Sequence, residues 1–578
     1  MRRLNLHTIA VIFLLLFSFS ASIIVNRTVF ERLPHLEDEF AYLYQARIFA
    51  RLQAWVPRNE PVKIFWQPFV IQPEQSSDGV AKRFGKYTPG WPLLLASGAA
   101  IDSPWIVNAW FAILNVALTY RLGREIFDKT VGLVGSLLLA LSPMALLLNA
   151  TLMSHPSAMF LTLLFVYAYW RLLKTDHWRY HWGVVAGIAL GLNVISRPLT
   201  AAAIALPVAL HALLYLIATL IRQSTRQRLL KLFVPLVVLT ICAAPVAALW
   251  PLFNYIWTGD WRTNVYTLQW SYDRVGFGIG YGPNQQEGHT LTKGWRNARN
   301  DLQFYFRDLN GFTLDPSLER LIAKMTGWGA GAGLAWLLIA LGLLAGHRRV
   351  WIWLLFALLV SIVMAQMAYW IGSSVNGSAA YSVRYYYEAT FAICLVSAYG
   401  IVALARLLNG KLASTAANAA FVTKLKAAWQ SWSPVYVLLL ICCGLSLVGF
   451  TPARLRQPLP PEWNDGLWRY NKVGGEQIAQ IEAMRQQYGQ PGQQILIVVL
   501  RNPDPVIKDN WRDHATAMAL TSPFLDSDVI VARVFEVADI SEFTRRFPQR
   551  LVLYQIGEHL YSSVEAALRG AAQDTAGS

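Results

Sequence analysis

The chain has 578 residues, of which 55% are hydrophobic and only 15% are charged, and its mean hydropathy is +0.36. This composition is too apolar for a soluble protein, in which roughly a quarter of the residues are charged. Its net charge of +16 does not indicate nucleic-acid binding, because the basic residues fall in short clusters between apolar segments. The four cysteines lie in apolar segments without CxxC spacing, so the sequence supports neither a disulfide framework nor a zinc site. We therefore expect a polytopic membrane protein.

The first apolar segment follows Arg2 and Arg3 and covers residues 8–27. Ser20-Ala21-Ser22 is a plausible signal-peptide cleavage region, but the apolar run continues to Val25, which favours an uncleaved first helix. In either case the next segment lies outside the cytoplasm.

A membrane-spanning helix needs about 20 mostly apolar residues. We predict eleven spans, at residues 8–27, 104–123, 131–149, 156–174, 182–196, 198–220, 232–252, 326–346, 350–370, 385–407 and 433–450. The two segments around Pro198 could instead form one kinked span and a re-entrant piece, because proline interrupts helical hydrogen bonding.

Clusters of Lys and Arg mark alternate connections between the predicted spans, for example Arg121 with Arg124, Arg171 with Lys174, Arg222 with Arg226, Arg348 with Arg349, and Lys424 with Lys426. By the positive-inside rule these connections and the N-terminus are cytoplasmic. An odd number of spans then places the C-terminal part outside. The polar regions 28–103, 253–325 and 451–578 consequently face outward.

The predicted fold class is therefore mainly α, with a transmembrane domain over residues 1–450 and a small extracytoplasmic α/β domain over residues 451–578. In the second domain, β-branched apolar runs at 495–500, 529–534 and 551–556 alternate with helix-like stretches, which predicts strands separated by helices.

The first outward region opens with three adjacent acids, Glu37, Asp38 and Glu39, in the predicted first turn of a helix. Adjacent carboxylates repel one another, so one of them is expected to have an altered pKa or to be balanced by cations. The alternative is a solvated turn of an interfacial amphipathic helix.

A basic cluster precedes the second span, in Lys82-Arg83-Phe84-Gly85-Lys86, and a Pro/Gly/Trp turn follows it. A lysine held by such a turn suits a phosphate partner. Attraction of the cluster to lipid headgroups would explain it equally well.

Three further polar residues lie at outward helix ends: His155, Arg197 and Arg384. An arginine at membrane depth costs about 2.5–3.5 kcal/mol, so it normally faces a partner or a wet cavity. Glu388, four residues after Arg384, could form a local ion pair with it, and His155 could simply cap its helix.

Under this topology all of these residues share one membrane face, whereas a transporter is expected to place its polar residues near the midplane. The chain also contains no Walker or Rossmann motif for a nucleotide donor. The arrangement therefore favours an outward active site with a carboxylate base and cations for a phosphate.

The ordered series of motifs over residues 1–410 resembles the GT-C glycosyltransferases of the protein O-mannosyltransferase and aminoarabinose-transferase type, particularly bacterial homologues of unassigned substrate. The matching pieces are Asp38-Glu39-Phe40-Ala41-Tyr42, Lys86-Tyr87-Thr88-Pro89-Gly90-Trp91-Pro92, Ser154-His155, Ser196-Arg197-Pro198, Gly276-Phe277-Gly278 with His289, and Arg384-Tyr385-Tyr386-Tyr387-Glu388. Glu37, as a third acid, and Thr88, where the family often has proline, depart from the pattern.

The resemblance implies inverting transfer of a sugar from a polyprenyl-phosphate donor to an extracytoplasmic protein, glycolipid or glycan, in the bacterial inner membrane. Asp38 would be the general base, and Glu39 would orient the acceptor or a basic partner. The implied phosphate-binding residues are Lys86, Arg384, Arg197 and His155, and the implied substrate contacts are Tyr42, Tyr87, His289, Tyr385 and Glu388. No cofactor or metal is expected, although some GT-C relatives use a divalent metal. The alternatives are a transporter or lipid flippase and a non-catalytic scaffold.

Overall fold

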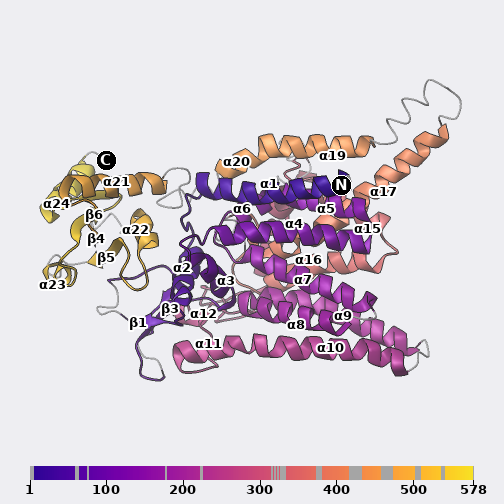
Figure 1. Ribbon diagram of the computed structural model, residues 1–578, viewed down its shortest axis with the longest axis horizontal. Coiled ribbons are helices and arrows are strands. Elements are labelled where there is room, and N and C mark those ends of the chain that lie inside the picture. Colours follow the sequence, from indigo (N-terminus) through magenta and orange to yellow (C-terminus); the bar gives the residue numbers. More distant parts are fainter. Residues whose placement is uncertain are drawn as a thin grey trace, which may run out of the picture.

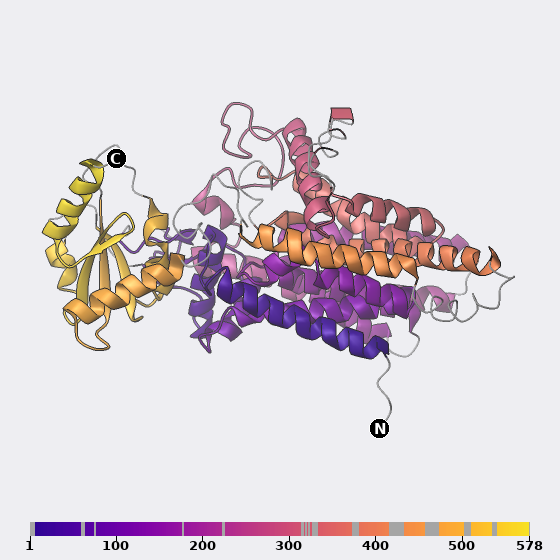
Figure 2. The same ribbon diagram turned by 90° about the horizontal axis from the view of Figure 1, so that it is seen from above.

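The computed structural model describes residues 6–58, 64–73, 77–175, 179–221, 226–313, 317, 321, 324–325, 333–372, 381–415, 433–456, 473–501, 510–534 and 540–576. Long helices lie side by side in one bundle, and a small sheet domain lies beyond one end of it (Figure 1). Helix α1 (Leu6–Thr28) begins well away from this domain, towards the opposite end of the bundle (Figure 2). The predicted fold class, mainly α with a C-terminal α/β region, is confirmed.

Among the described residues, eight helical segments are long and apolar enough to cross a membrane, and the bent pair α5 and α6 makes a possible ninth. The eight include α1 (Leu6–Thr28), α4 (Ile106–Ile126), α7 (His155–Lys174), α9 (Pro198–Ile221), α10 (Arg226–Ala247) with α11 (Leu249–Thr258), α16 (Val350–Met367), η1 (Arg384–Ala389) with α17 (Thr390–Thr415), and α19 (Pro434–Leu445) with η2 (Ser446–Phe450) and α20 (Thr451–Arg456). The bent pair is α5 (Lys129–Ala140) and α6 (Pro143–Asn149), which meet at 62°.

Two predicted spans fall outside this set. The segment 182–196 is helix α8 (Arg179–Ser196), and the described part of 326–346 is the short helix α15 (Ala335–Ala345). Residues 326–332 of the latter lie outside the described residues, as do Arg222, Lys424 and Lys426. The count of eleven spans stays a prediction.

The outer faces of the bundle are apolar. On α9, Leu206, Leu213 and Ile221 are exposed rather than packed inside the protein. Exposed leucine is unfavourable in water but not in hydrocarbon. These faces are therefore suited to contact with lipid.

Glycine spacing explains the close pairing of α8 with α10. Gly183, Gly187 and Gly191 recur every four residues and so lie on one face of α8. A side chain at Gly187 would run into the carbonyl oxygen of Leu239 on α10. Small residues at such positions let two membrane helices approach closely.

The first outer region carries α2 (Glu37–Ala50), the short strands β1 (Val56–Pro57), β2 (Val70–Ile71) and β3 (Lys82–Gly85), and α3 (Gly90–Ala99). The strands form an antiparallel sheet in the order β1-β3-β2. The second outer region carries α12 (Tyr266–Gln269) and α13 (Leu291–Asp308).

The C-terminal region confirms the three predicted strands: β4 (Ile495–Leu500), β5 (Val529–Val534) and β6 (Leu551–Ile556). They are parallel, and β7 (His559–Tyr561) adds an antiparallel strand in the order β5-β4-β6-β7. The helical elements around the sheet are α21 (Val473–Tyr488), η5 (Trp511–His514), α22 (Ala515–Leu520), α23 (Ile540–Thr544) and α24 (Val564–Ala576).

The C-terminal domain packs against the first outer region. Leu33 and Phe40 join the apolar cluster that contains Ile495 and Val529 of the sheet. The N–H of Arg533 on β5 donates to the carbonyl of Ile64 at 2.8 Å, which continues the hydrogen bonding at that edge of the sheet. The segment that carries the three acids is therefore in contact with both parts of the protein.

Candidate active site

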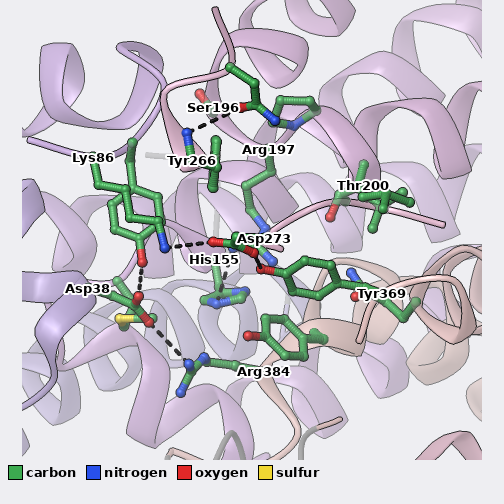
Figure 3. Close-up of a pocket in the computed structure, with 18 of the residues that line it drawn as sticks. Asp38, Lys86, His155, Ser196, Arg197, Thr200, Tyr266, Asp273, Tyr369 and Arg384 are labelled. Carbon is green, nitrogen blue, oxygen red and sulfur yellow. Dashed lines mark hydrogen bonds and ion pairs between the residues drawn. The ribbon is translucent and has the colours of Figure 1, made fainter. Parts of the chain in front are cut away.

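A cavity of about 200 Å³ lies where the outer segments meet the ends of the membrane helices (Figure 3). Its walls come from α2, the turn after β3, the break between α8 and α9, the loop before α13, the C-terminal end of α16, and η1. The residues singled out from the sequence that line it are Asp38, Tyr42, Lys86, Tyr87, His155, Arg197, Arg384 and Tyr385.

Asp38 lies in the first turn of α2, and its carboxylate enters the cavity (Figure 3). The hydroxyl of Tyr87 donates to Oδ1, and Nη2 of Arg384 donates to Oδ2 at 3.0 Å. The side chain is 16% exposed, so it is held but remains accessible from the cavity. A carboxylate positioned in this way can accept a proton from a bound hydroxyl.

Lys86 directly follows β3 and is buried, with its ammonium group among aromatic rings. Nζ lies 4.5 Å from the ring centroid of Phe69 and 4.4 Å from that of Trp270. The same Nζ is 2.6 Å from Oδ2 of Asp273. The lysine is therefore desolvated, and its charge is balanced by an acid that the sequence motifs did not single out.

Arg197 lies in the break between α8 and α9. Pro198 disfavours helical geometry in the residue before it, and its missing N–H is harmless at the first position of the next helix. The arginine Nε lies 2.8 Å from Oε1 of Glu388. The break thus lets a cation reach the cavity at the end of two apolar helices.

Glu388 does not line the cavity. Its Oε1 also lies 3.0 Å from Nδ1 of His155, so one buried carboxylate joins the histidine and Arg197. A local pair of Glu388 with Arg384 was the alternative interpretation of this motif, but Glu388 contacts His155 and Arg197, and residues 384–389 form a 3₁₀-helix. With three residues per turn, positions four apart point about 120° away from each other.

The tyrosines of the cavity keep their protons. Burial and the nearby Asp38 carboxylate raise the pKa of Tyr87, and burial raises the pKa of Tyr266 to about 12. Burial also raises the pKa of Tyr369, whose hydroxyl donates to Oδ1 of Asp273 at 2.7 Å. At neutral pH Tyr87 and Tyr369 therefore donate hydrogen bonds to the site carboxylates.

Glu39 lies behind the site rather than in it. Its carboxylate accepts the N–H of Leu36 and that of Leu152, together with the hydroxyl of Tyr381. The side chain is buried and is not part of the cavity wall. These hydrogen bonds hold the start of α2 in place. Glu39 therefore has a structural position, in contrast to the acceptor-orienting role that the resemblance implied.

His289 also lies away from the cavity wall. Its ring stacks on Phe277, with centroids 5.3 Å apart, and Nε2 is 2.9 Å from the carbonyl of Met367. The substrate contact that the resemblance implied for it has no geometric support. The histidine instead ties the outer loop to the end of α16.

Glu37 faces the C-terminal domain, where Nη2 of Arg512 is 3.6 Å from its Oε1. Burial raises the pKa of the Glu37 carboxyl, and Arg512 opposes that shift. The three adjacent acids thus have different surroundings: Glu37 lies near Arg512, Asp38 enters the cavity, and Glu39 is buried behind it.

The sequence motifs did not include several residues that line the cavity, chiefly Tyr266, Asp273, Arg274 and Tyr369. Asp273 and Arg274 lie in an aromatic run of an outward loop, Trp270-Ser271-Tyr272-Asp273-Arg274. A charged pair inside such a run is the signal that could have identified them. Within the described ranges, no group of three or more His, Cys, Asp or Glu residues is close enough to hold a metal ion.

A comparison with protein families finds a similarity over part of the chain. Residues 91–250 match the family model described as dolichyl-phosphate-mannose-protein mannosyltransferase. A comparison with curated proteins gave no match.

Solved structures with a similar arrangement include ArnT from Cupriavidus metallidurans bound to undecaprenyl phosphate, at 15% identity and a TM-score of 0.48, covering 94% of this chain and 89% of that one. Another is the oligosaccharyltransferase AglB from Archaeoglobus fulgidus in complex with an inhibitory peptide and a dolichol-phosphate, at 15% identity and a TM-score of 0.45, covering 95% of this chain and 69% of that one.

The matched stretch 91–250 contains two of the cavity residues singled out from the sequence, His155 and Arg197, together with the break at Pro198 that places the arginine. The part of the chain that carries these residues is therefore similar to the mannosyltransferases that this family model describes.

Proposed function

We propose that this protein transfers a sugar from a polyprenyl-phosphate carrier to an acceptor hydroxyl or phosphate on the outer side of the bacterial plasma membrane. The observation that carries the proposal is the convergence of one accessible carboxylate, Asp38, and three cations, Lys86, Arg197 and Arg384, in one cavity at the end of the bundle. The family description of residues 91–250 names a lipid-phosphate sugar as donor, which agrees with it.

In the proposed reaction, Asp38 accepts the proton of the acceptor while the acceptor oxygen attacks the anomeric carbon. The bond between that carbon and the phosphate oxygen breaks, and the lipid phosphate leaves with the bonding electrons. A phosphate leaving group needs its growing charge stabilised more than it needs a proton, and Lys86, Arg197 and Arg384 supply that charge. Attack opposite to the leaving group inverts the configuration of the sugar.

The positions of the basic residues support an outward orientation. Helix α7 begins at the cavity with His155 and ends with Arg171 and Lys174. Helix α16 begins after Arg348 and Arg349 and ends at the cavity. By the positive-inside rule we place the basic ends and the N-terminus in the cytoplasm, and the cavity with the C-terminal domain outside.

Cysteine labelling tests this orientation. Gln286→Cys in the outer loop and Arg348→Cys at the basic end are both exposed positions. An impermeant maleimide should label the first in intact cells and the second only after permeabilisation. The reverse pattern would invert the proposed topology.

The activity is tested with the full chain in vesicles, supplied with a polyprenyl-phosphate sugar. Asp38→Asn should abolish transfer, because the amide cannot accept the proton, while insertion into the membrane is preserved. The matched control is Asp102→Asn, which changes an exposed carboxylate in the turn after α3. Full activity in a folded Asp38→Asn protein would exclude the proposed base.

The same vesicles discriminate the transporter alternative. The residues that line the cavity lie near helix ends, at one end of the bundle. A transport path needs polar residues near the midplane of the bilayer. We expect a glycosylated product on one side of the vesicle. Transfer of unchanged substrate across the bilayer would favour transport instead.

A further inference from the structure

Asp273 is a buried acid inside the cavity that the reaction described above does not use. Its residue is 3% exposed, and it lies in the loop between α12 and α13. Oδ1 accepts the hydroxyl of Tyr369 at 2.7 Å and the indole N–H of Trp370 at 3.1 Å. Oδ2 lies 2.6 Å from Nζ of Lys86 (Figure 3). Two neutral donors thus fix one oxygen, and the other faces the lysine.

The aromatic surroundings of Lys86 explain why its ammonium needs an anionic partner. Rings of Phe69, Tyr87, Tyr266 and Trp270 lie within 4.4 to 5.8 Å of the ammonium. These rings exclude water, and an ammonium without water or an anion is costly in such a site. Asp273 supplies that anion in the structure.

Each of the three cations proposed to bind the phosphate has a carboxylate partner. Arg384 is paired with Asp38, Arg197 with Glu388, and Lys86 with Asp273. A phosphate that binds any of these three side chains must therefore share the cation with its carboxylate or replace that carboxylate. The Asp38 partner is needed as the base, and Glu388 lies outside the cavity wall.

Lys86 and Asp273 both line the cavity, as do Arg384 and Asp38, but Asp273 is not needed as the base. The approach of Nζ to Oδ2 is short, but Oδ2 has no aligned hydrogen bond. Asp273 is therefore the carboxylate of the three that a phosphate can replace without displacing the base and without reaching beyond the cavity wall.

We propose that Asp273 is a positioning residue that holds the Lys86 ammonium in the free enzyme, competes with phosphate for it, and thereby speeds release of the lipid-phosphate product. The inference rests on the proposed function, because it assumes that the reaction forms a lipid phosphate.

The charge of the two ligands explains why release, more than binding, responds to Asp273. In the donor, the phosphate is a diester with a single negative charge. The product is a monoester, which carries about −1.5 to −2 at pH 7 because its second pKa is about 6. Repulsion from the buried Asp273 carboxylate is therefore stronger for the product than for the donor, since charge repulsion scales with the product of the charges.

The test uses the full chain in nanodiscs, with undecaprenyl phosphate as the probe. Asp273→Asn keeps an oxygen that can accept from Tyr369 and Trp370 but removes the negative charge beside Lys86. We expect the variant to bind undecaprenyl phosphate at least 10-fold more tightly than the wild type does. In turnover, kcat should fall and product inhibition should strengthen, because release of the lipid phosphate becomes slow.

A pH series separates this role from a merely structural one. The gain in affinity of Asp273→Asn over wild type should be larger at pH 8 than at pH 5.5, where the lipid phosphate is mostly singly charged. Asp273→Ser should show the same trend. Asp260→Asn, which changes an acid of the same outer region that does not line the cavity, is the control and should bind like wild type.

The outcomes separate the two proposals. If wild type binds undecaprenyl phosphate but folded Asp273→Asn and Asp273→Ser bind it no more tightly, the role of Asp273 is wrong and the proposed function stands. If wild type neither binds the lipid phosphate nor transfers sugar, the proposed function fails, and this inference fails with it. Tighter binding that is lost on adding Lys86→Met supports the inference.

Discussion

The carboxylate of Glu31 accepts the backbone N–H of Gly474 at 2.8 Å and that of Gly475 at 3.0 Å, so the segment after the first span caps helix α21 of the C-terminal domain. The first N–H groups of a helix lack partners within it, and a carboxylate there also suits the helix dipole. On the other side of Asp38, Arg47 donates to the carbonyls of Ala519 and Thr521 at the end of α22. The C-terminal domain therefore holds the helix that carries the proposed base from both sides.

We predict that Arg47→Met loosens the contact between α2 and the C-terminal domain. A hydrogen bond from a charged group contributes about 1.5–3 kcal/mol, so opening of the interface should become roughly ten- to a hundredfold more frequent. Limited proteolysis of the full chain should release the C-terminal domain faster, and the transfer rate should fall.

Arg47→Lys, which keeps the charge, should show a smaller effect on both measurements. Unchanged proteolysis and activity in Arg47→Met would show that the apolar packing of Leu33 and Phe40 holds the domain without the arginine.

Arg384→Lys should lower kcat by roughly 10- to 100-fold with a smaller change in KM. Lysine keeps the positive charge but lacks the planar fork whose Nη2 donates to Asp38 at 3.0 Å, so the base loses its orientation. Steady-state kinetics of sugar transfer measures both constants. Arg349→Lys, an exposed change at the opposite end of the bundle, is the control. A kcat equal to wild type would show that Tyr87 alone orients Asp38.

The C-terminal domain should lose stability in mild acid because of His514. Burial lowers the pKa of this histidine from its ordinary 6.5 to about 3, so the unfolded chain binds a proton in this range that the folded domain does not. Stability therefore falls as pH drops below about 6.5 and continues to fall towards pH 3, at about 1.4 kcal/mol per pH unit, or about 2 kcal/mol by pH 5.

His514→Asn should flatten this pH dependence, measured by the rate of proteolytic release of the domain between pH 7 and pH 5. His559→Asn, at an exposed position of strand β7, provides the matched control and should follow wild type. A pH profile that is identical in all three proteins would assign the acid sensitivity to other groups.

Gly187→Ala should destabilise the pairing of α8 with α10. The added methyl would lie 2.3 Å from the carbonyl oxygen of Leu239, so the helices must separate, at a cost of about 1–3 kcal/mol. The midpoint of thermal unfolding in detergent should fall by several degrees. Gly444→Ala in α19, where a methyl group meets nothing within 4 Å, should leave the midpoint unchanged or slightly raised.

Helix positions, the α/β character of the C-terminal region and the ordered polar motifs could all be predicted from the sequence. The strands at 495–500, 529–534 and 551–556 matched the structure at both ends, because runs of β-branched residues bounded by polar stretches are a local signal. Asp38, Lys86 and Arg384 were singled out for the same reason: charged residues next to apolar spans stand out in a single sequence.

What the sequence by itself determined, then, is a membrane-embedded helical protein with charged motifs at one end of its spans. Only the tertiary structure decided which charged side chains pair with each other. Lys86 pairs with Asp273. Glu388 contacts His155 and Arg197. The tertiary structure also placed Glu39 and His289 outside the cavity wall, where they form hydrogen bonds that join distant segments of the chain. The physical reason is that hydropathy and helix periodicity are properties of neighbouring residues, whereas the partner of a buried charge depends on which distant segments of the folded chain exclude water around it.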